Sequence, residues 1–199
     1  EYRAMNIAVV IPCFNEEATI GKVVADFRAA LPDGVVYVYD NNSADRTAER
    51  AATAGAVVRY HPRAGKGEVV RRAFADVEAD IYVLVDGDDT YEAAAAPALV
   101  DLLVSRQLDF VNAARRATAD AAYRSGHRFG NGMFSGLVRL VFGRQFGDVL
   151  SGYKVLSRRF VKSFPAASTG FEIETELAVH SLELNMPSAE HMVGYRERP

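Results

Sequence analysis

Three carboxylates follow directly after an apolar run in the segment Ile81–Tyr91, and no other group of residues in the chain is better placed to do chemistry. Asp86, Asp88 and Asp89 are so close in sequence that they repel one another unless a proton or a cation relieves the charge. A hard divalent cation with oxygen ligands is the simplest solution. Because aspartate and glycine are also common in solvated turns, the cluster alone leaves both interpretations open.

The elements that must position these carboxylates alternate along the chain. Continuous apolar runs predict strands, and apolar residues at helical spacing predict helices. The predicted strands are Ile7–Ile11, Val35–Tyr39, Ala56–Tyr60, Ile81–Val85 and, shorter, Phe110–Asn112. The predicted helices are Ile20–Leu31, Ala44–Ala54, Glu68–Val77, Ala93–Ser105, Val155–Phe164 and Phe171–Leu184. Pro12 is expected to end the first strand, and Asn42 or Ser43 to cap the second helix.

Strand–helix alternation predicts an α/β fold with a mainly parallel sheet flanked by helices. Ligands of such sheets bind beyond the carboxyl ends of the strands. The polar residues expected at that rim are Asn15, Glu16, Asp40, Arg63, Lys66, Asp86 and Asp88. A carboxylate pair that binds a cation, together with a basic glycine loop, suits a diphosphate, because the cation bridges two phosphates.

Composition and missing motifs argue against several classes of function. The 199 residues suffice for one sizeable domain, and a net charge of −3 gives no reason to expect a nucleic-acid partner. No apolar run approaches the roughly 18–20 residues of a membrane span. The first strand is not followed by Gly-x-Gly-x-x-Gly, which argues against a dinucleotide site. Ala64–Gly67 lacks the hydroxyl residue and the upstream glycine of a Walker A loop.

Five motifs occur in the order found in family 2 glycosyltransferases of the GT-A fold. They are Ile11–Glu16, Asp40–Thr47, Gly65–Gly67, Val85–Asp89 and Ser151–Lys154. Within that family the chain most resembles the polyprenyl-phosphate glycosyltransferases, the bacterial relatives of dolichyl-phosphate mannose and glucose synthases. The resemblance implies one GT-A domain over residues 1–199, with a nucleotide-sugar-binding half in 1–113 and an acceptor-binding half in 114–199. Because the family usually continues further, we expect a chain truncated at its C-terminus.

The resemblance also implies which residues bind the donor, a nucleotide diphosphate sugar. Asp86 and Asp88 match the Asp-x-Asp motif that binds Mg²⁺ or Mn²⁺ on the diphosphate, with Gly87 between them, and Asp88 is counted among the catalytic groups. Thr90 stands where family members often carry a glutamine ligand, so water is an alternative third ligand. The other residues implied in donor binding are Pro12, Phe14, Asn15, Glu16, Asp40, Asn42, Lys66 and Gly67.

The acceptor determines which further groups are needed. A polyprenyl phosphate arrives as an anionic nucleophile, because its second pKa is about 6, and it needs arginines to position it. Arg115 or Arg116, and Arg128, fall where the lipid-phosphate enzymes carry such arginines, and Arg196 and Arg198 resemble the segment that closes the site. A hydroxyl acceptor would need a general base. The candidates for that base are Asp148, Glu172 and Glu174.

The expected activity is a metal-dependent, inverting transfer of a sugar to polyprenyl phosphate at the cytoplasmic face of the inner membrane, with the protein attached peripherally or through a part beyond this sequence. A glycosyltransferase acting on a hydroxyl acceptor in cell-envelope glycan synthesis is the first alternative. A nucleotidyltransferase is disfavoured because such enzymes usually carry a glycine-rich, basic first loop, and the first loop of this chain lacks that pattern. The sequence leaves open the sugar, the base, and whether the chain forms homo-oligomers.

Overall fold

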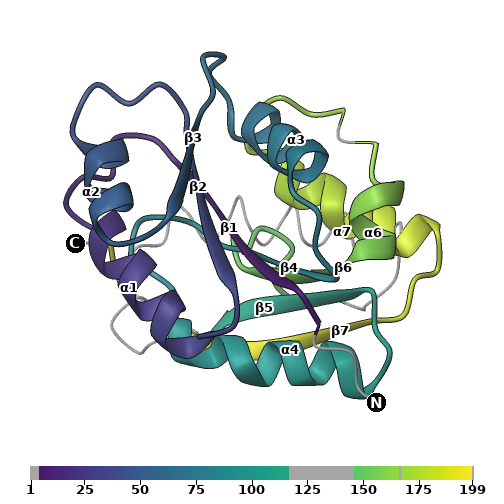
Figure 1. Cartoon of the computed structure of the whole chain (residues 1–199). Helices are drawn as coiled ribbons and strands as arrows, with labels where there is room; N and C mark the ends of the chain where they lie inside the picture. The colour runs from purple at the N-terminus through teal and green to yellow at the C-terminus, as the bar shows by residue number, and fades with distance from the viewer. Residues whose placement is uncertain (1–4, 117–145, 166, 199) are drawn as a thin grey trace.

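A seven-stranded sheet runs through the part of the chain that the computed structural model describes, residues 5–116, 146–165 and 167–198 (Figure 1). Its order is β3-β2-β1-β4-β6-β5-β7. Only β6 runs antiparallel to its two neighbours, which confirms the mainly parallel α/β fold. The strands are β1 (Ile7–Cys13), β2 (Val35–Asp40), β3 (Val57–Tyr60), β4 (Ile81–Leu84), β5 (Phe110–Arg116), β6 (Lys154–Ser157) and β7 (Ser188–Gly194).

Helices cover both faces of this sheet. On one face lie α1 (Ile20–Ala30), α2 (Thr47–Thr53) and α4 (Ala96–Ser105), the last preceded by the 3-10 turn η1 (Ala93–Ala95). On the other face lie α3 (Lys66–Asp76), α6 (Arg158–Ser163) and α7 (Ile173–Glu183). No helix in the described ranges is long and apolar enough to cross a membrane.

The central strands are apolar throughout because they are covered on both sides. Val9 and Ile11 of β1 pack toward α1, whereas Ala8 and Val10 pack toward α3. This alternation follows from the two-residue period of a strand, and the second helical layer explains why neither set is polar. Each fully buried valine or isoleucine contributes about 1.5–3 kcal/mol relative to an exposed position. The rim of the sheet is therefore carried by a rigid core.

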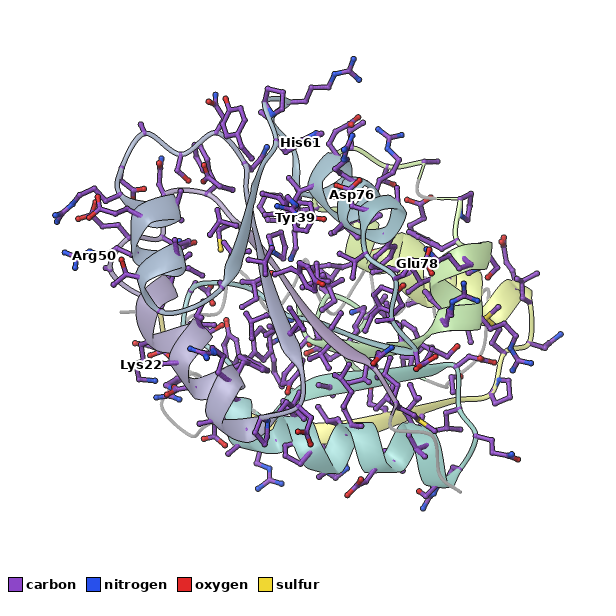
Figure 2. The ribbon with its side chains drawn as sticks, viewed as in Figure 1. Lys22, Tyr39, Arg50, His61, Asp76 and Glu78 are labelled. Carbon is purple, nitrogen blue, oxygen red and sulfur yellow. The ribbon has the colours of Figure 1, made fainter. Side chains whose placement is uncertain are left out.

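Tyr39 joins β2 to α3, the helix that begins at Lys66. Its hydroxyl donates a hydrogen bond to Asp76 Oδ2 at 3.4 Å, and Asp76 also accepts one from Arg72 at 2.7 Å (Figure 2). Burial, followed by the charge of Asp76, raises the pKa of Tyr39 to about 12. The tyrosine therefore stays a hydrogen-bond donor at neutral pH and anchors α3 to the sheet.

Two element ends expected in the first 60 residues are wrong. Pro12 does not end the first strand, since β1 continues to Cys13 with Pro12 opposite Tyr39 in the parallel register. A missing N–H near a strand end costs the ladder little. The second helix begins at Thr47, and neither Asn42 nor Ser43 caps it. The preceding residues are instead held by the loop after β1, where Asn15 Oδ1 accepts a hydrogen bond from the Ala44 N–H at 2.9 Å.

The helix expected over Val155–Phe164 is wrong at its start. The first three of these residues belong to β6, which is inserted between β4 and β5, and α6 begins at Arg158. Ser157 Oγ caps α6 by accepting a hydrogen bond from the Phe160 N–H at 3.1 Å. Strand β7 was not expected at all. It is only partly buried and pairs in parallel with β5, so its apolar pattern is weak.

Candidate active site

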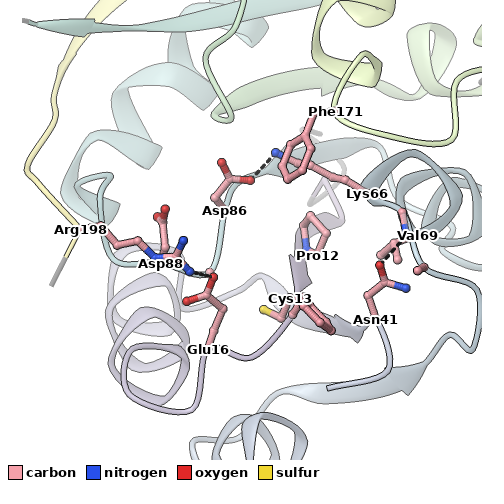
Figure 3. Close-up of a pocket in the computed structure, with 14 residues that line it drawn as sticks. Pro12, Cys13, Glu16, Asn41, Lys66, Val69, Asp86, Asp88, Phe171 and Arg198 are labelled. Atoms are coloured by element: carbon pink, nitrogen blue, oxygen red, sulfur yellow. Dashed lines mark hydrogen bonds and ion pairs between the residues drawn. The ribbon is translucent and has the colours of Figure 1, made fainter. Parts of the chain in front are cut away.

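A pocket of about 350 Å³ opens at the carboxyl ends of β1, β2 and β4 (Figure 3). It brings together the loop after β1, the glycine loop at the start of α3 and the carboxylates after β4. Seven of the residues assigned to donor binding from the sequence line it, namely Pro12, Phe14, Glu16, Lys66, Asp86, Gly87 and Asp88. The rule that ligands of parallel sheets bind at this edge therefore locates this pocket correctly.

Lys66 links two carboxylates at the centre of the pocket. Its Nζ lies 2.5 Å from Asp86 Oδ1 and 2.5 Å from Glu174 Oε1, and the side chain is largely buried. Burial alone would lower the pKa of Lys66, but the charges of Asp86 and Glu174 outweigh it and raise that pKa above its ordinary value. Lys66 is therefore a permanent cation beside Asp86. Glu174, offered as a base, does not line the pocket and holds Lys66 instead.

Asp88 is oriented by the residue two positions after it. Its Oδ1 accepts hydrogen bonds from Thr90 Oγ1 at 2.7 Å and from the Thr90 N–H at 3.2 Å. Thr90 is buried and turned toward Asp88. The threonine that replaces the family's glutamine therefore positions one carboxylate of the pair.

A segment following β7 crosses the pocket on the Asp88 side. Arg198 pairs with the carboxylate of Glu16, and both side chains line the pocket (Figure 3). The Arg196 N–H donates to the Thr90 carbonyl at 3.0 Å, which lays this segment along the loop after β4. Burial, helped by Asp88, raises the pKa of Glu16 despite the hydrogen bond from Arg198. The pair places a guanidinium where an anionic ligand of the pocket would meet it.

Two glycines allow the backbone to approach these groups closely. A Cβ on Gly152 would collide with the carboxylate of Asp86, and a Cβ on Gly67 would collide with the Ser168 carbonyl. Gly67 itself is buried, donates its N–H to the Thr169 carbonyl at 3.0 Å and does not line the pocket. Gly67 therefore allows the loop of Lys66 to pack against the 168–169 segment.

The carboxylates of the pocket fit a hard divalent cation that is also coordinated by oxygen atoms of a substrate. Within the described ranges, no group of three or more histidine, cysteine, aspartate or glutamate side chains is placed to hold a metal ion by itself. Asp86 and Asp88 supply two carboxylates, and Mg²⁺ is typically bound through one or two carboxylates plus phosphate oxygens and water. Nearby diphosphate oxygens would complete the coordination. The residues present therefore fit the expected Mg²⁺ or Mn²⁺.

Three predicted donor residues organise loops and do not line the pocket. Asn15 accepts a hydrogen bond from Ala44 and, through its own N–H, donates to Ser43 Oγ at 2.9 Å. Asp40 Oδ1 accepts from the Ser43 N–H at 3.3 Å. Asn42 has a positive φ of 63°, and its Oδ1 accepts from the Tyr60 hydroxyl at 2.7 Å. These contacts hold the loops after β1 and β2 together beneath the rim.

Asn41 lines the pocket and was missed among the assigned residues. Its Oδ1 accepts from the Gly65 N–H at 2.8 Å, and its Nδ2 donates to the Arg63 carbonyl at 2.5 Å. Asn41 thereby fixes the glycine loop to the end of β2 (Figure 3). Its place between Asp40 and Asn42 was the available signal, but three adjacent polar residues look alike in sequence.

The acceptor-side residues lie apart from the pocket lining. Arg115 makes a bidentate pair with Asp148, with Nε to Oδ2 and Nη2 to Oδ1 both at 2.7 Å. The Arg115 guanidinium also lies 5.4 Å from the ring centre of Tyr195. Burial would raise the pKa of Asp148, but Arg115 lowers it below its ordinary value, so Asp148 is a poor proton acceptor. Arg128 lies outside the described residues.

Comparison with known proteins agrees with the motifs. Residues 8–164 match the model of the family described as Glycosyl transferase family 2. Protein RfbJ of Shigella flexneri is 52% identical over 128 residues, which cover 64% of this chain and 99% of that protein. Glycosyltransferase AglJ of Haloferax volcanii is 32% identical over 196 residues, and the match spans 97% of this chain and 64% of that protein. A dolichyl-phosphate hexose transferase of Haloferax volcanii is 29% identical over 199 residues, covering 100% of this chain and 86% of that protein.

A solved structure with the same architecture contains a metal ion and a donor. Glucosyl-3-phosphoglycerate synthase from Mycobacterium tuberculosis, crystallised with Mn²⁺, UDP-glucose and phosphoglyceric acid, superposes with a TM-score of 0.81 at 28% identity, covering 98% of this chain and 73% of that one. The family match spans most of the sequence, and both the fold and the order of the motifs agree with it. This chain therefore belongs to glycosyl transferase family 2, has the GT-A fold and is a glycosyltransferase.

Proposed function

We propose that this glycosyltransferase moves a sugar from a nucleotide diphosphate sugar to a polyprenyl phosphate, with inversion at the anomeric carbon. A phosphate oxygen of the acceptor forms the new bond to that carbon. The bond from the carbon to the donor diphosphate breaks, and the nucleoside diphosphate leaves with the bonding electrons. The Mn²⁺ and UDP-glucose complex of the mycobacterial synthase supports the donor, and the dolichyl-phosphate hexose transferase supports the acceptor.

We place the donor in this pocket, with its diphosphate between the two carboxylates and the side chains of Lys66 and Arg198. When bound, a divalent cation would neutralise the charge that develops on the leaving diphosphate. Asp86 and Asp88 would hold that cation, with Thr90 keeping Asp88 in place. Lys66 and Arg198 line the same pocket and supply fixed positive charge for the phosphates. Asn41 and Phe14 occupy other parts of the lining and are available to the nucleoside.

The state of the candidate bases favours the phosphate acceptor. Asp148 is committed to Arg115, and Glu174 to Lys66, so neither carboxylate is free to take a proton from a hydroxyl. Glu172 is exposed and does not line the pocket. A phosphate monoester needs no such base, because it is largely ionised at neutral pH. This commitment of both carboxylates to ion pairs is the observation that carries the choice of acceptor.

The proposed acceptor also sets the place of reaction. A polyprenyl chain stays in the bilayer, so its phosphate reaches a pocket of this kind only at the membrane surface. We therefore propose the cytoplasmic face of the inner membrane, where nucleotide sugars are available, with this part of the protein associated peripherally.

A paired-acceptor assay tests the proposal. The protein is incubated with Mn²⁺, a panel of radiolabelled UDP-, GDP-, CDP- and dTDP-sugars, and either polyprenyl phosphate or the matching polyprenol in detergent. We expect label in the organic phase with the phosphate, none with the alcohol, and none after chelation with EDTA.

Three results would contradict the proposal at different levels. Transfer to the polyprenol alone would replace the phosphate acceptor with a hydroxyl acceptor. Metal-dependent donor hydrolysis without transfer to either lipid would keep the donor site and reject the lipid acceptor. Release of pyrophosphate from a sugar phosphate and a nucleoside triphosphate would favour the nucleotidyltransferase.

A further inference from the structure

A buried lysine lies behind the pocket and has no part in the reaction as proposed above. Lys154 is the first residue of β6, its side chain is fully buried, and it does not line the pocket. We infer that Lys154 is a positioning residue that holds the turn of residues 149–152 against Asp86 and thereby keeps this carboxylate aimed at the divalent cation. The inference rests on the proposed donor site and is independent of the acceptor.

The ammonium of Lys154 donates its hydrogen bonds to neutral oxygen atoms. It donates to Asn112 Oδ1 at 3.2 Å, to the Val149 carbonyl at 3.4 Å and to the Ser151 carbonyl. Three acceptors match the three N–H bonds of a lysine. Two of them belong to the same turn, so the lysine ties both ends of that turn to the start of β6.

This turn ends at the residue that touches Asp86. Gly152 follows Ser151, and a Cβ on Gly152 would collide with the Asp86 carboxylate. The Gly152 N–H donates to the Tyr91 hydroxyl at 2.8 Å, and Ser151 Oγ donates to the Ala113 carbonyl at 2.6 Å. The backbone of Gly152 therefore packs directly against the Asp86 carboxylate, and the hydrogen bonds from Lys154 fix the position of that backbone.

Asp86 is in contact with the Gly152 backbone and with Lys66. The Lys66 ammonium approaches Asp86 Oδ1 at 2.5 Å from the side of the pocket. If the Gly152 backbone moves, the Asp86 carboxylate gains freedom to rotate away from the position of the divalent cation. Asn41 and Phe14 line other parts of the pocket, and Asn41 is held by Gly65, so we expect nucleoside contacts to be unaffected.

Other residues hold the beginning of the same loop. Asp148 is fixed by Arg115, and Glu190 Oε2 accepts hydrogen bonds from the Gly147 N–H at 2.8 Å and the Asp148 N–H at 3.2 Å. Removing Lys154 would therefore release the Gly152 end and leave the Gly147 end in place. The expected defect is local.

Burying an ammonium is unfavourable, which argues that the lysine is there for its hydrogen bonds. Burial lowers the pKa of Lys154 to about 8. The Nζ also lies 6.0 Å from the ring centre of Phe110, so an apolar side chain of similar length would fill this space without the cost of desolvation. A methionine at this position removes the donors and keeps the volume.

The test compares Lys154→Met with Lys162→Met by calorimetric titration of UDP with and without Mn²⁺. Lys162 is a matched control, since its Nζ donates to the Phe74 carbonyl at 3.2 Å and pairs with Glu78, away from the pocket. In Lys154→Met we expect unchanged metal-free binding of UDP and a loss of about tenfold in the enhancement by Mn²⁺. Lys162→Met should keep the full enhancement.

A second variant changes the contact between Gly152 and Asp86 directly. Gly152→Ala should reduce the enhancement by Mn²⁺ as well, and the double variant with Lys154→Met should lose less than the product of the two single effects, because both act on one contact. An unchanged enhancement in a folded Lys154→Met protein would overturn the positioning role. An equal loss with and without Mn²⁺ would overturn it too. Absence of Mn²⁺-dependent UDP binding in the unaltered protein would instead overturn the proposed donor site, and this inference with it.

Discussion

Lys66 Nζ lies 2.5 Å from Asp86 Oδ1, so the chain's own ammonium rests against a carboxylate that we propose as a cation ligand. The same ammonium is held by Glu174 at 2.5 Å. Like charges that share a site need a compensating cation, and Lys66 supplies it for both carboxylates. A divalent cation that binds Asp86 must therefore compete with Lys66, whereas the diphosphate that arrives with it is attracted by the same lysine.

Replacement of Lys66 by methionine should therefore change metal and nucleotide binding in opposite directions. Without the competing ammonium, we expect Mn²⁺ alone to bind about fivefold more tightly, which corresponds to about 1 kcal/mol. Metal-free UDP should bind more weakly, because a phosphate-binding cation is lost. Electron paramagnetic resonance of free Mn²⁺ and calorimetry of UDP measure the two effects. Lys162→Met, which removes a lysine paired with Glu78 away from the pocket, is the control. Weaker binding of both ligands would show that Lys66 does not oppose the metal.

Neutralising Asp88 should abolish metal-dependent transfer, while neutralising its neighbour Asp89 should not. Asp89 pairs with Lys22 and does not line the pocket. Loss of a metal ligand removes several kcal/mol of charge stabilisation, so we expect kcat of Asp88→Asn to fall more than about 100-fold. Asp89 has a positive φ of 58°, which asparagine tolerates, so Asp89→Asn should fold normally and stay active. Initial rates at several Mn²⁺ concentrations compare the two, and equal losses would contradict the assignment.

Glu174 should prove to be a support for Lys66 and not a general base. A general base contributes roughly 100-fold to 10,000-fold to the rate. In Glu174→Gln we expect a smaller loss than that and an unchanged pH dependence of kcat, because the amide still accepts a hydrogen bond from Lys66. The pH–rate profiles of both proteins provide the measurement. Loss of the acidic limb of the profile in the variant would restore Glu174 as the base and favour a hydroxyl acceptor.

Lys154 should make stability depend on pH in the alkaline range. Its pKa is about 8 in the folded protein against an ordinary value of 10.5. Between these values the unfolded chain keeps a proton that the folded chain has released, so the free energy of unfolding rises with pH. Lys154→Met lacks this contribution. Urea unfolding of both proteins at several pH values should show the stability difference shifting in favour of the unaltered protein from about pH 8 to about pH 10.5. A difference that does not vary with pH would show that the amine titrates normally.

The first half of the fold could be predicted because its strands are covered on both sides. Such strands are apolar throughout, as in Ile7–Ile11 and Ile81–Val85, and polar residues begin where each strand ends. Once the strands are ordered in parallel, their ends share one edge, which brings Glu16, Lys66 and Asp86 together without any knowledge of the structure.

The second half could not be predicted as well, because its signals are tertiary. Lys154 opens a strand whose first three residues are buried, and a lysine is not expected at a buried strand position. The strand Ser188–Gly194 alternates weakly because it lies at the sheet edge. The pairings of Glu174 with Lys66 and of Asp148 with Arg115 join residues that only the fold brings together, so two carboxylates that looked free as bases proved to be committed.

The contact between Arg198 and Glu16 joins positions that are 182 residues apart. As the chain leaves the ribosome, the sheet edge with Asp86 and Lys66 is synthesised long before the segment that carries Arg198. Domains fold during synthesis from the amino end, and distant contacts form late because closing a long loop costs entropy. The core around β1 and β4 would therefore be in place before Arg198 reaches Glu16, so this side of the pocket is completed after its base.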